Sequence, residues 1–142
     1  MKKIFLTLFI LLICLTISAI GFYYTYRDDM NHLMKFNSEF EEYKDKKIKG
    51  TEIATVINKA VDYNEKNKIP KDENGNYIEN DDTSIKVDVY IQDNKTTYSM
   101  ETIYKLGTEQ FVENFNIETF KCTKVEYHNR SKRIKYLYFE QV

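Results

Sequence analysis

Residues 4–24, around which the rest of the chain is organised, read IFLTLFILLICLTISAIGFYY. This stretch contains no charged residue, and about 20 apolar residues wound as a helix match the hydrocarbon core of a bilayer. Lys2 and Lys3 precede it, and an aromatic cluster ends it just before Arg27. The pattern predicts a single transmembrane helix with a polar domain attached to it.

The aromatic cluster favours a retained anchor over a cleaved signal peptide. Tyr and Phe gather where a retained helix leaves the bilayer, and a signal peptide has a shorter apolar core of about 7–15 residues. Ala19 and Gly21 are small enough to leave cleavage, and hence a secreted domain, as an alternative. Ile13 is too large to precede a lipid-modified Cys14. The expected membrane-interface residues are Phe22, Tyr23, Tyr24 and Tyr26.

The charges that flank residues 4–24 predict the orientation of this helix. Lys2 and Lys3 stand against its start, whereas Arg27 on the other side is followed by two aspartates. Positive charge is retained in the cytoplasm. We therefore expect a single-pass signal-anchor protein with a cytoplasmic N-terminus and an extracytoplasmic domain.

The composition of the polar part excludes one class of partner. All 22 Asp and Glu, and all but two of the 21 Lys and Arg, follow the apolar stretch. Such a balanced mixture argues against nucleic acid, which calls for a clear basic excess. Cys14 lies in the predicted span and Cys122 in the polar domain, so an intramolecular disulfide between them is geometrically implausible. We expect Cys122 to be a small buried side chain.

An apolar stripe predicts that the transmembrane helix continues beyond the membrane. No Gly or Pro interrupts residues 27–44, and apolar residues recur there near helical spacing. Gly50 is read as a turn and Thr51 as the N-cap of a second, amphipathic helix at residues 51–66. The stripe, a candidate packing or interface surface, consists of Met30, Leu33, Met34, Phe40 and Tyr43. The expected buried face of the second helix consists of Ile53, Val56, Ile57, Ala60 and Val61.

Residues 85–142 are expected to be mainly β, with short helices. A strict alternation over residues 85–91 predicts a strand, residues 96–100 its hairpin partner, and residues 117–127 with 133–141 a second hairpin. One or two short helices are expected at residues 101–116, the second capped by Thr108. The chain is therefore divided into a transmembrane anchor, residues 1–26, and a soluble α+β domain, residues 27–142. That domain begins with a helical extension and turn, residues 27–50, and contains an antiparallel sheet of about four strands.

The sequence contains no recognisable catalytic motif, so we expect neither an enzyme nor a cofactor. His32 and His128 are read as exposed structural residues. Asp72 and the two asparagines that follow at alternate positions copy part of an EF-hand loop. Tyr77 stands where that loop needs Gly, however, and Thr83 where it needs Glu. We expect a solvated turn and no metal site.

Six basic residues near the C-terminus form a local cluster with two interpretations. The cluster either contacts anionic lipid or protects strand edges from pairing with other chains. The second is the simpler reading. The residues are Lys121, Lys124, Arg130, Lys132, Arg133 and Lys135.

The layout resembles that of type IV pilins and pseudopilins, in which a long N-terminal helix leaves the membrane and a sheet covers its outer half. The resemblance covers the architecture alone, because residues 4–24 follow no Gly-ended leader and contain no acidic residue. It implies a structural or assembly component of a membrane or secretion apparatus, with self-association or a membrane-protein partner. The alternative is a membrane-tethered binding or sensing module.

Overall fold

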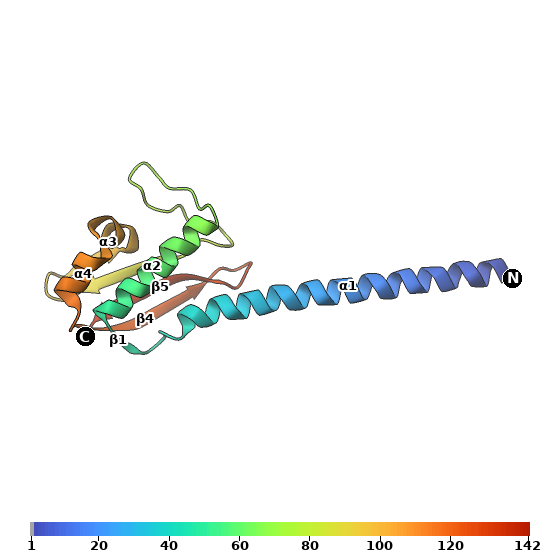
Figure 1. Ribbon diagram of the computed structural model, residues 1–142, viewed down its shortest axis with the longest axis horizontal. Coiled ribbons are helices and arrows are strands. Elements are labelled where there is room, and N and C mark those ends of the chain that lie inside the picture. The colour runs from blue at the N-terminus through green and yellow to red at the C-terminus, as the bar shows by residue number, and fades with distance from the viewer. Residues whose placement is uncertain (1) are drawn as a thin grey trace. The chain divides into compact units, whose positions relative to one another are not determined.

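The computed structural model describes residues 2–142, which form two compact units. One unit ends at Phe36, and the other, called the head domain below, is Asn37–Val142. The expected α+β fold class is confirmed. Figure 1 labels the elements, which in chain order are α1 (Lys2–Glu41), β1 (Lys47–Lys49), α2 (Gly50–Lys66), β2 (Lys86–Ile91), β3 (Thr96–Ser99), α3 (Met100–Leu106), α4 (Thr108–Phe115), β4 (Thr119–Tyr127) and β5 (Ile134–Gln141).

Helix α1 is continuous over 40 residues and contains the whole apolar stretch. At 1.5 Å per residue its length is about 60 Å, twice what the hydrocarbon core requires. Within residues 2–142 it is the one helix long and apolar enough to cross a membrane. Its last turn, from Asn37 onward, belongs to the head domain. The predicted continuation of the apolar helix into a longer one is therefore confirmed.

The sheet of the head domain has five strands in the order β1-β4-β5-β2-β3, and it is mixed. Strands β2 and β5 pair in parallel, and the other neighbours are antiparallel. The expected number of about four strands is close to the five observed, but the expected antiparallel topology was wrong for the β2–β5 pair. Strand β1 has three residues with Ile48 as its one buried side chain, so it offers no period to recognise. The alternation within a strand identifies its faces but not its neighbours.

Three helices, α2, α3 and α4, lie on one face of this sheet (Figure 1). The predicted buried face of α2 is confirmed, since all five of its residues are at most 1% exposed. Helix α2 begins at Gly50, and the Glu52 carboxylate accepts the Lys49 N–H at 2.9 Å. The predicted cap at Thr51 was therefore wrong. Gly50 is required by packing, because a Cβ there would lie 2.1 Å from the Phe115 carbonyl oxygen.

One or two short helices were predicted at residues 101–116, and two are present, α3 and α4. The Ser99 hydroxyl caps α3 by accepting the Thr102 N–H at 3.3 Å. Gly107, with a φ of 101°, separates the two helices and is itself the N-cap of α4. The predicted cap at Thr108 was wrong, since its hydroxyl instead accepts a 3.4 Å bond from Asn58.

Candidate functional site

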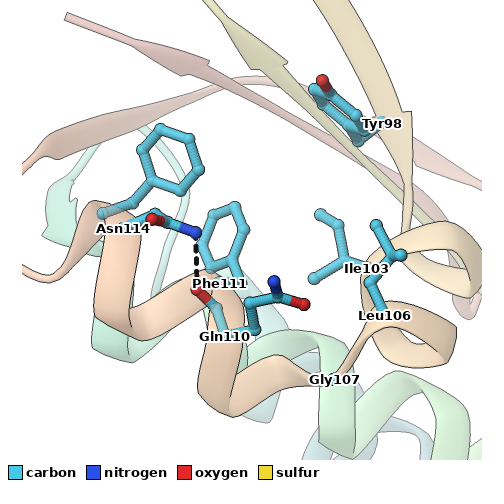
Figure 2. Close-up of a pocket in the computed structure, with 8 residues that line it drawn as sticks. Tyr98, Ile103, Leu106, Gly107, Gln110, Phe111 and Asn114 are labelled. Atoms are coloured by element: carbon cyan, nitrogen blue, oxygen red, sulfur yellow. Dashed lines mark hydrogen bonds between the residues drawn. The ribbon is translucent and has the colours of Figure 1, made fainter.

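The head domain contains an apolar groove between the edge strand β3 and helices α3 and α4, which we call the edge groove. Strand β3 leads directly into α3, and the turn at Gly107 brings α4 back beside it. The groove has a volume of about 280 Å³. Figure 2 shows side chains from all three elements around this space. They include Tyr98, Ile103, Leu106, Gln110, Phe111 and Asn114.

The walls of the edge groove are apolar, and its rim carries amides. Ile103 and Phe111 are buried, whereas Leu106 is 63% exposed at the rim. The rings of Phe111 and Phe115 lie 4.9 Å apart between centroids, which fixes the wall that α4 provides. Asn114 Nδ2 donates to the carbonyl of residue 110 at 2.9 Å. Among the described residues that line it, none carries a formal charge.

The two edges of the sheet differ in chemistry. Edge strand β1 is flanked and occupied by lysines, including Lys47 and Lys49. Charged side chains, lysine above all, deter another strand from pairing with an edge. Edge strand β3 reads TTYS and carries no charge. The uncharged edge is therefore the one beside the edge groove.

A second depression, of about 670 Å³, lies between residues 71–77 and α3. Glu101 lines it, and its Oε1 accepts the Tyr77 N–H at 3.2 Å. Glu101 Oε2 has no partner but is closed off from solvent.

The predicted membrane-interface residues all lie on α1 and are exposed. Phe22 is 82% exposed and Tyr26 is 65% exposed. The rings of Tyr23 and Tyr24 meet edge to face with centroids 5.9 Å apart, and the Arg27 guanidinium lies 6.0 Å from the Tyr24 centroid. Aromatic and cationic groups adjacent on one turn are the combination expected of an interfacial belt.

The predicted interface stripe is divided between the two units. Phe40 and Tyr43 lie in the core of the head domain, where they are 2% and 8% exposed. Met30, Leu33 and Met34 lie on the part of α1 that precedes the head domain. Phe40 and Tyr43 are therefore not available as an interface. Burial, together with the Glu42 charge, raises the pKa of the Tyr43 hydroxyl, although the nearby Lys59 opposes this.

The EF-hand-like stretch forms a closed turn. Asp72 Oδ1 accepts the N–H groups of Asn74 and Asn76, each at 2.9 Å, and Oδ2 accepts the Asn76 side-chain amide. These bonds, those from Asn76 first, hold the pKa of Asp72 below its usual value. No group of three or more His, Cys, Asp or Glu within residues 2–142 could hold a metal ion. The side chain of Asp72 thus organises the turn.

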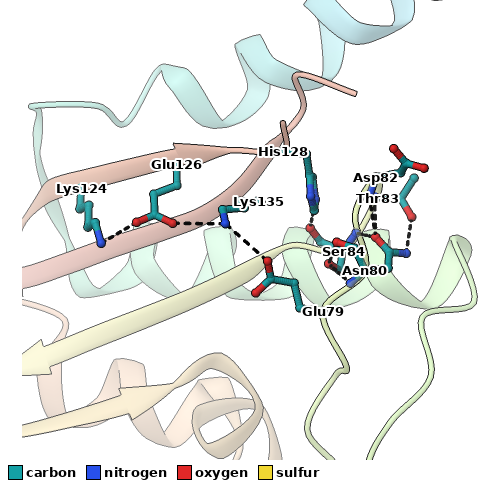
Figure 3. A network of polar contacts seen from close by, with 9 residues as sticks. All are labelled: Glu79, Asn80, Asp82, Thr83, Ser84, Lys124, Glu126, His128 and Lys135. Carbon is teal, nitrogen blue, oxygen red and sulfur yellow. Dashed lines mark hydrogen bonds and ion pairs between the residues drawn. The ribbon is translucent and has the colours of Figure 1, made fainter. Parts of the chain in front are cut away.

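The C-terminal basic cluster is partly neutralised by ion pairs, which Figure 3 shows in part. Lys135 Nζ lies 3.5 Å from Glu126 and 3.4 Å from Glu79, and Lys124 also pairs with Glu126. The hydrogen bond from Lys124 is the main reason that the pKa of Glu126 is lowered. Elsewhere Arg130 pairs with Asp82 at 3.4 Å. The interpretation that the cluster protects strand edges was wrong, because β4 and β5, which carry its three strand lysines, are interior strands of the sheet.

His128 was expected to be exposed, and that expectation was wrong. It is 3% exposed, and its Nε2 lies 2.7 Å from the Ser84 carbonyl oxygen. Ser84 is tied in turn to Asn80, whose Oδ1 accepts three successive backbone N–H groups (Figure 3). A turn residue can be buried when another loop packs over it, which hydrophobic periodicity does not reveal. Cys122, by contrast, is buried as expected, at 1% exposed.

No protein-family model, curated protein or solved structure matches this chain significantly. Neither the edge groove nor the uncharged edge was identified from the sequence. The available signals were the uncharged TTYS segment and the exposed Leu106 beside Gly107. Both are too short to carry a periodic pattern.

Proposed function

We propose that this chain is a membrane-anchored binding protein, in which residues 4–24 span the bilayer and the head domain binds a partner outside the cytoplasm. The observation that carries the proposal is the edge groove, an apolar space open beside an uncharged strand edge. Apolar walls with a few polar groups at the rim are typical of binding sites. The aliphatic, aromatic and amide side chains that line the edge groove are suited to binding a partner and not to transferring protons.

The anchor is supported by the chemistry of α1. The large apolar side chains of residues 4–24 are all exposed within the described structure, from Ile13 at 42% to Phe22 at 82%. Exposing so much continuous apolar surface to water is unfavourable, at about 25 cal/mol per Å². A bilayer removes that cost, and Lys2 and Lys3 favour the cytoplasmic side for the N-terminus.

Site-specific photocrosslinking in native membranes tests the proposal. A photoreactive residue at Gln110 should give a discrete crosslinked partner, because Gln110 lines the edge groove. Adding Leu106→Lys to the same chain should abolish that adduct by placing a charge at the rim. The control position is Ile117, which is 76% exposed but does not line the groove. The proposal would be contradicted if Gln110 and Ile117 gave the same crosslinked adducts and Leu106→Lys left them unchanged.

A second candidate function is assembly in the manner of a pilin-like component. It rests on Met30, Leu33 and Met34, which recur on α1 outside the head domain, with Met34 56% exposed. With both native cysteines replaced, Met34→Cys should form disulfide-linked dimers in the membrane if this surface self-associates. His32→Cys, on the opposite side of the same helix, is the control. Equal crosslinking of the two variants would exclude a specific interface.

A further inference from the structure

We infer that the partner is a polypeptide that adds an extended segment to the free edge of β3, with uncharged apolar side chains at alternate positions entering the edge groove. This inference rests on the proposed binding role of the groove and specifies its occupant. Three features of the head domain lead to it: the direction of Tyr98, the main-chain groups of β3 and the absence of charge.

The direction of Tyr98 shows which side chains of an added strand would enter the groove. Tyr98 pairs with Val89, and Val89 is fully buried beneath the helices. Paired residues in adjacent strands point to the same face of a sheet. Tyr98 therefore points to the helix layer, where it lines the groove. Every second residue of a strand added beside β3 would point into the same space.

The main-chain groups of β3 match the backbone of an added polypeptide strand. Strand β3 ends the sheet, so none of the described strands pairs with its outer side. An edge strand presents a row of N–H and C=O groups at the spacing of another backbone. Asn94 Oδ1 accepts the Thr96 N–H at 3.1 Å, and Ser99 is the N-cap of α3, so the usable edge is centred on Thr97 and Tyr98. A short addition of this kind predicts modest affinity.

The absence of charge around the groove determines which side chains can enter. Its described lining carries no formal charge, so a buried cation or anion would find no counter-ion there. A volume of about 280 Å³ suits one or two apolar side chains. The amides of Gln110 and Asn114 at the rim can form hydrogen bonds with polar atoms of the partner that flank its apolar side chains. Strand β1, which carries lysines at both ends, offers no comparable site.

Peptide binding to the full-length protein in detergent micelles tests this mode. The probe is a capped peptide of alternating leucine and threonine, compared with two matched peptides. One is N-methylated at alternate backbone nitrogens, which removes its main-chain donors, and the other has lysine in place of leucine. Each change should weaken binding by about tenfold or more. Leu106→Lys in the protein should do the same, whereas Ile117→Lys should not.

Hydrogen exchange locates the bound peptide. Amides of β3 should become protected when the unmodified peptide binds, and amides of β1 should not. If the N-methylated peptide binds as tightly as the unmodified one, strand addition is overturned. If Leu106→Lys still weakens peptide binding in that case, the groove remains a binding site. Equal binding of the lysine peptide overturns the requirement for uncharged side chains. No binding of the unmodified peptide at millimolar concentration overturns the inference, while photocrosslinking from Gln110 tests the proposed function separately.

Discussion

Asn64 shows at the scale of one residue what hydrophobic periodicity does not detect. It is fully buried on α2, its Nδ2 donates to the Ile85 carbonyl at 2.7 Å, and its Oδ1 accepts the Ile85 N–H at 2.9 Å. The side chain thereby satisfies both backbone groups of the residue just before β2. The five apolar residues of the same helix were predicted correctly because burial follows their spacing. A single buried amide does not produce a periodic sequence pattern, so its hydrogen-bond partner can be identified only from the structure.

Asn64→Leu should therefore destabilise the head domain by about 3 kcal/mol, because it leaves two buried backbone groups unpaired. Chemical denaturation of the full-length protein in detergent measures this change. Asn58→Leu on the same helix is the control, since Asn58 is only half-buried and makes one long bond of 3.4 Å. Equal losses for the two variants would mean that the bonds from Asn64 contribute little.

Cys122 predicts a dependence of stability on pH. Burial raises the pKa of its thiol from 9.0 to about 11. Between those two values the unfolded chain loses the thiol proton while the folded chain keeps it, so the free energy of unfolding falls as the pH rises. The slope from this group is at most about 1.4 kcal/mol per pH unit. Cys122→Val should show a shallower decline between pH 9 and 11, and parallel curves for the two proteins would contradict the assignment.

At the scale of elements, local patterns predicted the helices and hairpins, while contacts between distant elements determined the rest. The β2–β3 and β4–β5 hairpins follow from alternation and turn residues. The parallel pairing of β2 with β5 joins two hairpins that are separated by α3 and α4, and no local pattern specifies it. The edge groove depends on that arrangement as well, because it needs α4 beside a strand at the end of the sheet.

The contact between α2 and α4 makes Gly50 sensitive to substitution. An added Cβ would lie 2.1 Å from the Phe115 carbonyl oxygen, so the two helices must move apart. Gly50→Ala should cost about 2–3 kcal/mol in the free energy of unfolding, as overpacking does elsewhere. Gly21→Ala is the matched helical control, because nothing lies within 4 Å of the added Cβ. An unchanged midpoint for Gly50→Ala would show that the start of α2 adjusts freely.

At the scale of the whole molecule, the proposed function depends on two features. One can be recognised in the sequence, and the other only in the structure. The apolar stretch at residues 4–24 is evident from composition alone, and the structure contains it in one continuous helix. The edge groove is formed by three elements of the head domain, β3, α3 and α4, and cannot be predicted from the composition of the sequence. The function that we propose needs both features, an anchor in the membrane and a groove that can bind a partner.

Thiol labelling of intact cells tests this account most directly. In the unsubstituted chain, an impermeant maleimide should find no target, because Cys14 lies in the proposed span and Cys122 is 1% exposed. A cysteine introduced by Gln110→Cys should be labelled in intact cells and remain in the membrane fraction. One introduced by Lys3→Cys should be labelled only after the cells are opened. Labelling of Lys3→Cys but not Gln110→Cys in intact cells, or release of the head domain from the membrane, would contradict the account.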